Sequence, residues 1–205
     1  YLLRAIEDND AVAVDIGALK VSDEYTFKHS VDVATMSMIV ARKYGLDDKQ
    51  VYEIGIAGLL HDIGKSKVPN EILNKAAKLT DEEFAIMKQH SVYGYRILQP
   101  KEDLSMEIKL GVLQHHERCD GSGYPNKLKK DMISRFGRVL AILDIYDAMA
   151  GDRVFAKRRS PFDVFSILYD DILNGRLDTE YGVLFIKHLC HSLNGNWVSL
   201  SNGKK

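Results

Sequence analysis

Apolar residues recur at helical spacing along almost the whole chain, and only four prolines interrupt them. One stripe repeats with the 3.6-residue period of a helix, ends near the stop signal Gly45, and comprises Val31, Ala34, Met38, Val40 and Ala41. Residues 51–60 are apolar on nearly every side. This second segment predicts a short helix that is buried on several faces.

Thr80 marks the start of a further predicted helix. Glu83 follows it three residues later, which is the spacing of a capping box. We expect this helix to continue through His90 towards Leu98 and to end before Pro100. The same periodicity predicts helices over residues 104–117, 136–149, 161–173 and 179–193. The predicted fold class is therefore all-α.

Two segments depart from the helical pattern. Residues 119–131 contain the Gly- and Pro-rich run Asp-Gly-Ser-Gly-Tyr-Pro over positions 120–125, which predicts a loop. Residues 197–200 alternate like a strand and precede Asn202-Gly203, a hairpin turn signal. We therefore expect a short β-like tail after the last helix.

Composition narrows the classes of protein. The chain has 205 residues, 45% of them hydrophobic and 28% charged, which is typical of a folded domain. A net charge of −1 gives no bulk attraction to a DNA or RNA polymer. Cys119 and Cys190 form no paired motif, so we expect neither disulfides nor a cysteine zinc site, and a cytoplasmic location. No apolar run reaches the roughly 20 residues that span a membrane.

Histidines and aspartates supply the candidate chemistry. Five of the seven histidines and two aspartates stand at or within the predicted apolar helices, namely His29, His61, Asp62, His90, His115, His116 and Asp144. A lone carboxylate inside an apolar helix is costly to bury. Imidazole and carboxylate together suit divalent metals such as Fe, Mn or Zn.

Each of these residues alone has an ordinary interpretation. The pair His115-His116 could be a solvated helix end, Asp144 could be half-exposed, and His90 could lie on the surface. Their occurrence together favours a metal site. His188 and His191 stand three residues apart without an acidic partner at ligand spacing, so we interpret both as structural.

The order and spacing of several motifs resemble the HD-GYP phosphodiesterases of the HD hydrolase superfamily. The resemblance runs from about Asp23 to Arg159 and includes His-Asp-Ile-Gly-Lys at 61–65, His-His-Glu-Arg at 115–118, the 120–125 loop, Asp-Ile-Tyr-Asp-Ala-Met at 144–149 and Asp-Arg at 152–153. It implies an HD-type helical bundle with extra C-terminal helices over residues 21–205. Residues 1–20 would form an N-terminal helix or connector.

The resemblance also implies a centre of two divalent metal ions, Fe or Mn. One ion would be held by His29, His61, Asp62 and Asp144, and Asp62 would bridge to a second held by His90, His115 and His116. Members that bind a third ion carry a glutamate where Tyr25 stands here, so we expect two. Two such ions lower the pKa of a bridging water and clamp phosphodiester oxygens. Lys65 would neutralise a phosphate oxygen, unless it is a solvated helix-end lysine.

The implied activity is hydrolysis of a cyclic dinucleotide second messenger, with cyclic di-GMP favoured and 3′,3′-cyclic GMP-AMP next. The product would be a linear dinucleotide or, after a second cut, mononucleotides. One alternative is a catalytically silent module that senses a nucleotide or binds a partner protein. Another is an HD phosphohydrolase that acts on mononucleotides. An upstream regulatory domain and a homodimer are both compatible with the sequence.

Residues outside the candidate ligand set supply the candidate substrate contacts. Arg153 matches the phosphate-contacting arginine of the family. Lys157 opens a basic cluster, which either replaces the basic residue expected at Ala156 or is a solvated end. Tyr124 could stack on a base or pack its own loop down. Glu117 and Arg118 could orient the histidine pair or form a surface ion pair.

Overall fold

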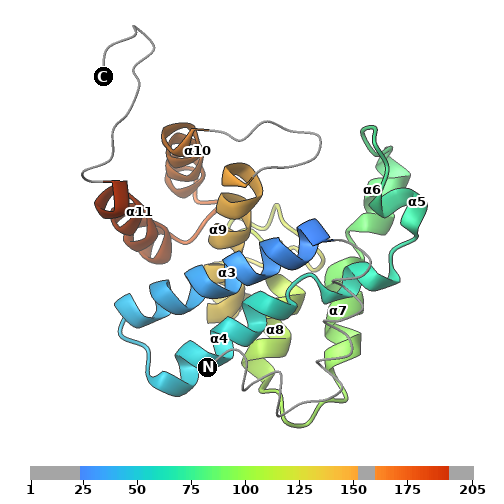
Figure 1. Ribbon diagram of the computed structural model, residues 1–205, viewed down its shortest axis with the longest axis horizontal. Coiled ribbons are helices and arrows are strands. Elements are labelled where there is room, and N and C mark those ends of the chain that lie inside the picture. The colour runs from blue at the N-terminus through green and yellow to red at the C-terminus, as the bar shows by residue number, and fades with distance from the viewer. Residues whose placement is uncertain (1–23, 152–159, 194–205) are drawn as a thin grey trace, which may run out of the picture.

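The structure, a computed structural model, describes residues 24–151 and 160–193 (Figure 1). The predicted connector over 1–20, the β-like tail, Arg153 and Lys157 lie outside these ranges. Within them the chain folds into helices and loops, and its only β pairing is an isolated bridge between Asp120 and Lys129. The prediction of an all-α fold is confirmed.

The helices follow one another through short connections. Their bounds are α3 Glu24–Lys43, α4 Asp48–Leu60, α5 Asn70–Leu73, α6 Asp81–Met87, α7 His90–Leu98, α8 Met106–Gln114, α9 Arg135–Ala150, α10 Pro161–Leu173 and α11 Thr179–Leu193. Two short 3-10 helices, Ile63–Lys67 and Lys130–Met132, lie between them. Among the described residues no helix is long and apolar enough to cross a bilayer. Cys119 and Cys190 are free thiols.

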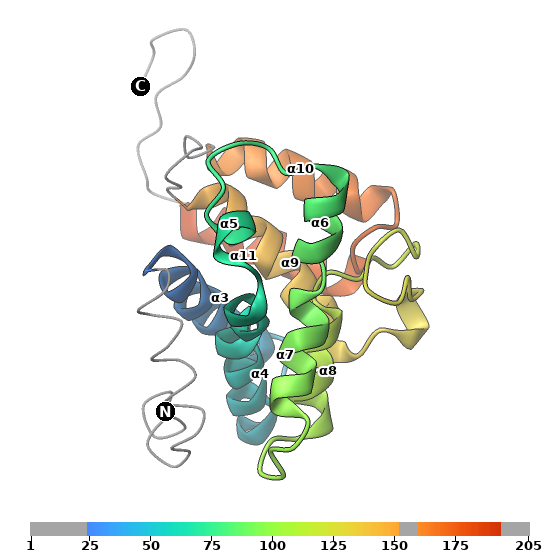
Figure 2. The ribbon, with the colours of Figure 1, turned by 90° about the vertical axis from the view of Figure 1, so that its right-hand side faces the viewer.

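Helix α4 packs against α3, α8 and α9 and lies beside α3 (Figures 1 and 2). Ile54, Ala57 and Leu60 are fully buried, which confirms the prediction of a helix apolar on several sides. Gly58 lets α3 approach closely, because a Cβ at this position would lie 2.8 Å from Cα of Ala34. The end of α4 is thereby fixed deep inside the bundle.

The helix predicted from Thr80 to Leu98 is divided into two. The capping box between Thr80 and Glu83 is present, but α6 ends at Met87 and α7 begins at His90. Helix α6 buries none of its residues, whereas α7 packs against α8 and the 63–67 turn. A Cβ at Gly64 would overlap the main-chain oxygen of His90 at 1.9 Å. The start of α7 therefore lies beside the 63–67 turn that follows α4.

The C-terminal helices α10 and α11 pack against α9 and match the predicted extra helices in their bounds. Asp178 links α11 to α9. Its buried carboxylate accepts hydrogen bonds from the main-chain N–H groups of Glu180 and Tyr181 and pairs with Arg138 at 2.9 Å. Helix α9 therefore packs against α3, α8, α10 and α11.

Candidate metal centre

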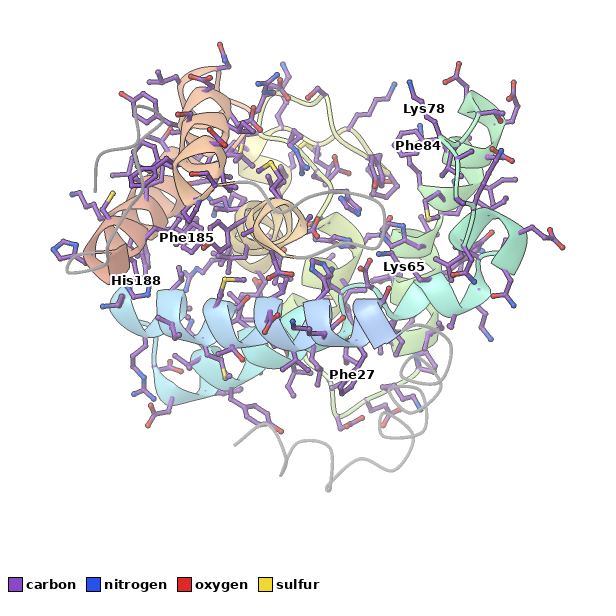
Figure 3. The ribbon with its side chains drawn as sticks, turned by 45° about the horizontal axis from the view of Figure 1, so that its top comes forward. Phe27, Lys65, Lys78, Phe84, Phe185 and His188 are labelled. Atoms are coloured by element: carbon purple, nitrogen blue, oxygen red, sulfur yellow. The ribbon has the colours of Figure 1, made fainter. Side chains whose placement is uncertain are left out.

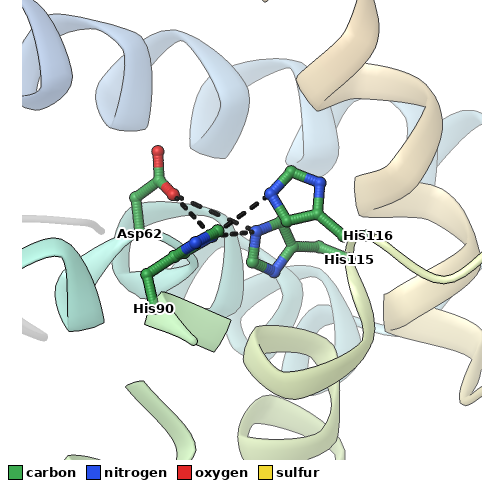
Figure 4. A group of neighbouring side chains, drawn as sticks. All are labelled: Asp62, His90, His115 and His116. Carbon is green, nitrogen blue, oxygen red and sulfur yellow. Dashed lines mark hydrogen bonds and ion pairs between the residues drawn. The ribbon is translucent and has the colours of Figure 1, made fainter. Parts of the chain in front are cut away.

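The seven predicted metal ligands lie together in one cluster. Their ligand atoms form two groups, each within 4.8 Å, which are His29, His61 and Asp144 in one and Asp62, His90, His115 and His116 in the other. Helix α3 supplies the first histidine, the end of α4 the His-Asp pair, the start of α7 His90, the end of α8 the His-His pair, and α9 Asp144. Figure 4 shows the second group.

Asp62 lies between the two groups. Its Oδ2 atom is 3.3 Å from Nε2 of His61 and 3.8 Å from Nε2 of His29. Its Oδ1 atom is 3.3 Å from Nε2 of His90 and 4.0 Å from Nε2 of His115. The two oxygens of one carboxylate therefore face different sets of imidazoles, which is the arrangement that a bridging ligand requires.

Three of the histidine rings are oriented by the main chain. In each, Nδ1–H donates to the carbonyl three residues earlier at 2.7 Å, and the pairs are His61 with Gly58, His90 with Met87 and His115 with Val112. A carbonyl only accepts, so Nδ1 carries the hydrogen and Nε2 presents its lone pair in the neutral ring. Nε2 of His90 nevertheless lies 3.3 Å from Nε2 of His115. Lone pairs that converge in this way fit a shared cation.

Asp147 is a member of the site to which the sequence analysis gave no role. Its Oδ2 atom accepts the Nδ1–H of His29 at 2.6 Å, while Nε2 of the same ring lies 3.1 Å from Oδ1 of Asp144. Burial lowers the pKa of His29, but hydrogen bonds to the two carboxylates outweigh it and raise the pKa to about 9. The available signal was the i, i+3 spacing of the two aspartates, which puts both on one face of α9.

The cluster is charged in the way a metal site needs. Burial would raise the pKa of Asp62, yet Lys65 at 2.5 Å and His61 hold it well below its usual range. Burial lowers the pKa of His116 to about 3 and, with the neighbouring His116, that of His115 well below its ordinary value. Near neutral pH Asp62 is therefore ionised and His115 and His116 are neutral, which are the forms that bind metals. His29 carries a proton that a bound metal would displace.

The ordinary interpretations of the single residues are wrong for the cluster. Asp144 is 9% exposed and His90 only 2%, and the His-His pair is no solvated helix end. Away from the cluster, His188 lies on α11 (Figure 3). His191 is exposed and donates to the main-chain oxygen of Lys187. Both fit the structural interpretation.

The 120–125 loop packs against the cluster through Tyr124. This ring stacks on His116 with 4.6 Å between centroids. Glu117 is 1% exposed, and its carboxylate accepts from the main-chain N–H groups of Asn126 at 2.7 Å and Leu128 at 2.9 Å. Glu117 therefore fastens the loop, and it forms no ion pair with any residue in the described part of the chain. The peptide bond before Pro125 is cis.

A cavity of about 360 Å³ opens onto the cluster, lined by His29, Lys65, His116, Arg118, Asp144, Ile145, Ala148 and Met149. Two cations and an apolar wall from α9 therefore surround the ligand atoms. The volume falls within the range of small-molecule sites.

Fold and site together define a class: an all-α protein with a buried histidine–aspartate centre suited to divalent metals. The family model described as HD domain matches residues 14–180. The chain belongs to the HD domain family, and its HD-GYP resemblance is confirmed by its curated relatives.

The chain is 40% identical over 186 residues to the cyclic di-GMP phosphodiesterase PA4108 of Pseudomonas aeruginosa, covering 91% of this chain and 44% of that relative. It is 38% identical over 156 residues to a cyclic di-GMP phosphodiesterase of Thermotoga maritima, covering 76% and 42%. It is 34% identical over 157 residues to 3′3′-cGAMP-specific phosphodiesterase 1 of Vibrio cholerae, covering 77% and 36%. The chain thus spans less than half the length of these relatives.

Two solved structures share the fold. Bd1817, an HDG"Y"P protein from Bdellovibrio bacteriovorus, aligns with a TM-score of 0.65 and 23% identity over 82% of this chain and 52% of that one. The HD domain of the phosphodiesterase PgpH from L. monocytogenes, in complex with cyclic-di-AMP, aligns with a TM-score of 0.66 and 17% identity over 91% and 99%. They confirm the predicted HD-type bundle.

Proposed function

We propose that this domain is a metal-dependent phosphodiesterase that opens a cyclic dinucleotide, with cyclic di-GMP favoured and 3′,3′-cyclic GMP-AMP next. The observation that carries the proposal is the carboxylate of Asp62, whose two oxygens face two separate groups of buried imidazoles. The relatives named for both cyclic dinucleotides support the substrate class. The product would be the linear dinucleotide and, after a second cut, mononucleotides.

The seven clustered residues would hold two divalent ions. Oδ2 of Asp62 would join the group of His29, His61 and Asp144, and Oδ1 would join His90, His115 and His116. Neutral imidazoles and carboxylates suit Fe or Mn. When bound, such a pair of ions polarises a phosphoryl oxygen and supplies a nucleophile from water near neutral pH.

The protein's own groups position the substrate. Lys65 lines the cavity, and its Nζ atom lies 2.5 Å from Asp62. Its charge would therefore stabilise a phosphate oxygen that lies beside this carboxylate, through a hydrogen bond. Ile145 and Met149 form an apolar wall that suits a nucleobase and excludes water. Tyr124 would add a further contact, and the sequence predicts two more from Arg153 and Lys157, which lie outside the described residues.

The test is turnover by protein purified anaerobically and loaded with Mn or Fe. Both cyclic dinucleotides and a set of mononucleotides are incubated with wild type, Asp62→Asn and Asp170→Asn, the last a matched change at an exposed aspartate. We expect Asp62→Asn to fall below about 1% of wild-type turnover, because a carboxamide is a poor bridge between two cations. Elemental analysis should show at least one ion fewer per chain, while Asp170→Asn retains both.

Each alternative function predicts a different result in this assay. Bound metal without turnover of either cyclic dinucleotide would refute the phosphodiesterase and favour the silent sensing module. Turnover of mononucleotides alone would favour the broader HD phosphohydrolase. Full activity in Asp62→Asn would show that the bridging role is wrong.

A further inference from the structure

Two cationic side chains line the cavity beside the cluster, and they differ in their partners. Lys65 pairs with Asp62 at 2.5 Å, so its charge is balanced by a carboxylate of the cluster. Arg118, which follows α8, forms no salt bridge with any residue that the structure describes. The cavity therefore contains one cation whose charge is not balanced by a protein carboxylate.

The guanidinium of Arg118 is held from one side only. Its Nη1 atom donates to the main-chain carbonyls of Glu117 at 2.8 Å and His115 at 3.4 Å. Its other two nitrogens make no hydrogen bond to any residue in the ranges 24–151 and 160–193. Neither nitrogen is among the buried side-chain atoms that lack a partner, so both are accessible to a ligand. A guanidinium anchored in this way presents a planar set of donors, which matches the oxygens of a phosphate.

A cyclic dinucleotide brings two phosphodiester groups into the site, and only one is cut at a time. The phosphate to be cut must lie at the cluster, beside Asp62 and Lys65. The other carries a negative charge into a cavity that also contains the carboxylate of Asp144, so it needs a cation of its own. We propose that Arg118 binds this second, uncleaved phosphate. The proposal rests on the proposed phosphodiesterase function and names a substrate contact for it.

The kinetic test compares a substrate with two phosphates and a substrate with one. Wild type, Arg118→Gln and Arg118→Lys are assayed on cyclic di-GMP and on bis(p-nitrophenyl) phosphate. Glutamine can still donate to the main-chain carbonyls but carries no charge. We expect Arg118→Gln to raise KM for cyclic di-GMP about tenfold or more, the effect of one charged hydrogen bond, with kcat within about threefold. On bis(p-nitrophenyl) phosphate its kcat/KM should stay within about twofold of wild type, and Arg118→Lys should be intermediate on cyclic di-GMP.

Separate measurements show whether the substitution of Arg118 damages the fold or the metal centre. Metal content and melting temperature should match wild type in Arg118→Gln, and Lys187→Gln, an exposed charge removal on α11, should match wild type in every assay. Equal losses on both substrates, a loss of metal, or no change on either substrate would each overturn the role of Arg118.

A binding measurement distinguishes a failure of the Arg118 proposal from a failure of the proposed phosphodiesterase function. Treatment with EDTA gives metal-free protein that cannot hydrolyse the substrate. This protein is titrated with cyclic di-GMP in a calorimeter. If wild-type protein binds cyclic di-GMP but does not cleave it after metal loading, the proposed phosphodiesterase function is refuted and the phosphate contact of Arg118 is not. A Kd for Arg118→Gln equal to that of wild type would refute the phosphate contact, whereas a Kd about tenfold weaker supports it whether or not turnover occurs.

Discussion

At the scale of single residues, Asp147 determines how His29 faces the cluster. Its carboxylate accepts the Nδ1–H of His29 at 2.6 Å, on the side of the ring opposite the candidate ligand atom. A carboxylate in this position fixes the ring and makes Nε2 more basic. His61, His90 and His115 use main-chain carbonyls for the same purpose, so among these four rings His29 is the one held by a side chain.

Asp147→Asn should therefore weaken metal binding without unfolding the domain. The carboxamide keeps an acceptor oxygen of similar shape but loses the charge, and we expect metal affinity to fall about 10- to 100-fold. Competition with a chromophoric chelator measures this affinity, and Asp170→Asn serves as the control. Unchanged affinity in Asp147→Asn would mean that His29 needs no orienting partner.

At the scale of elements, Glu117 joins the end of α8 to the loop that carries Tyr124. Its two carboxylate oxygens accept main-chain N–H groups from Asn126 and Leu128. Tyr124 in turn stacks on His116. The loop therefore holds one face of a candidate ligand, and Glu117 holds the loop.

Glu117→Gln should loosen this loop, because its amide group would place a donor against one of the two main-chain donors. We expect the free energy of unfolding to fall by about 1–3 kcal/mol, the cost of a buried polar group without a partner. Hydrogen exchange at the amides of Asn126 and Leu128 should become faster. Urea denaturation and exchange measurements test both, with Glu102→Gln at an exposed position as control. Slow exchange at both amides in the variant would contradict this role.

Local signals predicted most elements and missed those that depend on tertiary contacts. The bounds of α10 and α11 agree with the sequence prediction, and Ser160 and Pro161 give α10 a clear start. The break between α6 and α7 was missed because apolar residues continue at helical spacing through it. The close approach of His90 to Gly64 is a tertiary contact that this spacing does not reveal. Similarly, Glu117 binds main-chain groups nine and eleven residues away, which no side-chain pattern reveals.

At the scale of the whole molecule, the candidate ligands come from α3, α4, α7, α8 and α9, over positions 29 to 144. They meet only when these helices pack, so we expect metal binding to be coupled to folding. The sequence pointed to all seven residues that meet in the cluster, because each is an unusual residue type in or beside an apolar helix. Their grouping around Asp62 came from the resemblance, and the packed helices show where each ring lies.

Protons and metal ions compete for the imidazoles of this site, and the pKa of His29 determines over which pH range they do so. In the metal-free protein its pKa is raised to about 9, so its contribution to stability is complete below the unfolded value near 6.5 and is lost as pH rises through 9. His116 behaves oppositely. Its pKa of about 3 gives stability that is present above about 6.5 and is lost as pH falls towards 3. Between pH 7 and 9, His29 therefore holds a proton and His116 does not.

Metal affinity should consequently rise with pH until His29 is deprotonated. Binding at Nε2 displaces the proton of His29, so we expect the apparent affinity for Mn to increase about tenfold per pH unit from pH 7 to 9 and to level off above that. Calorimetry in buffers of different ionisation enthalpy should show about one proton released from His29 per chain at pH 7.5. In Asp147→Asn the levelling-off should begin at lower pH, because one of the carboxylates that stabilise the cation has lost its charge. An affinity independent of pH over this window would show that His29 is already neutral before metal binds.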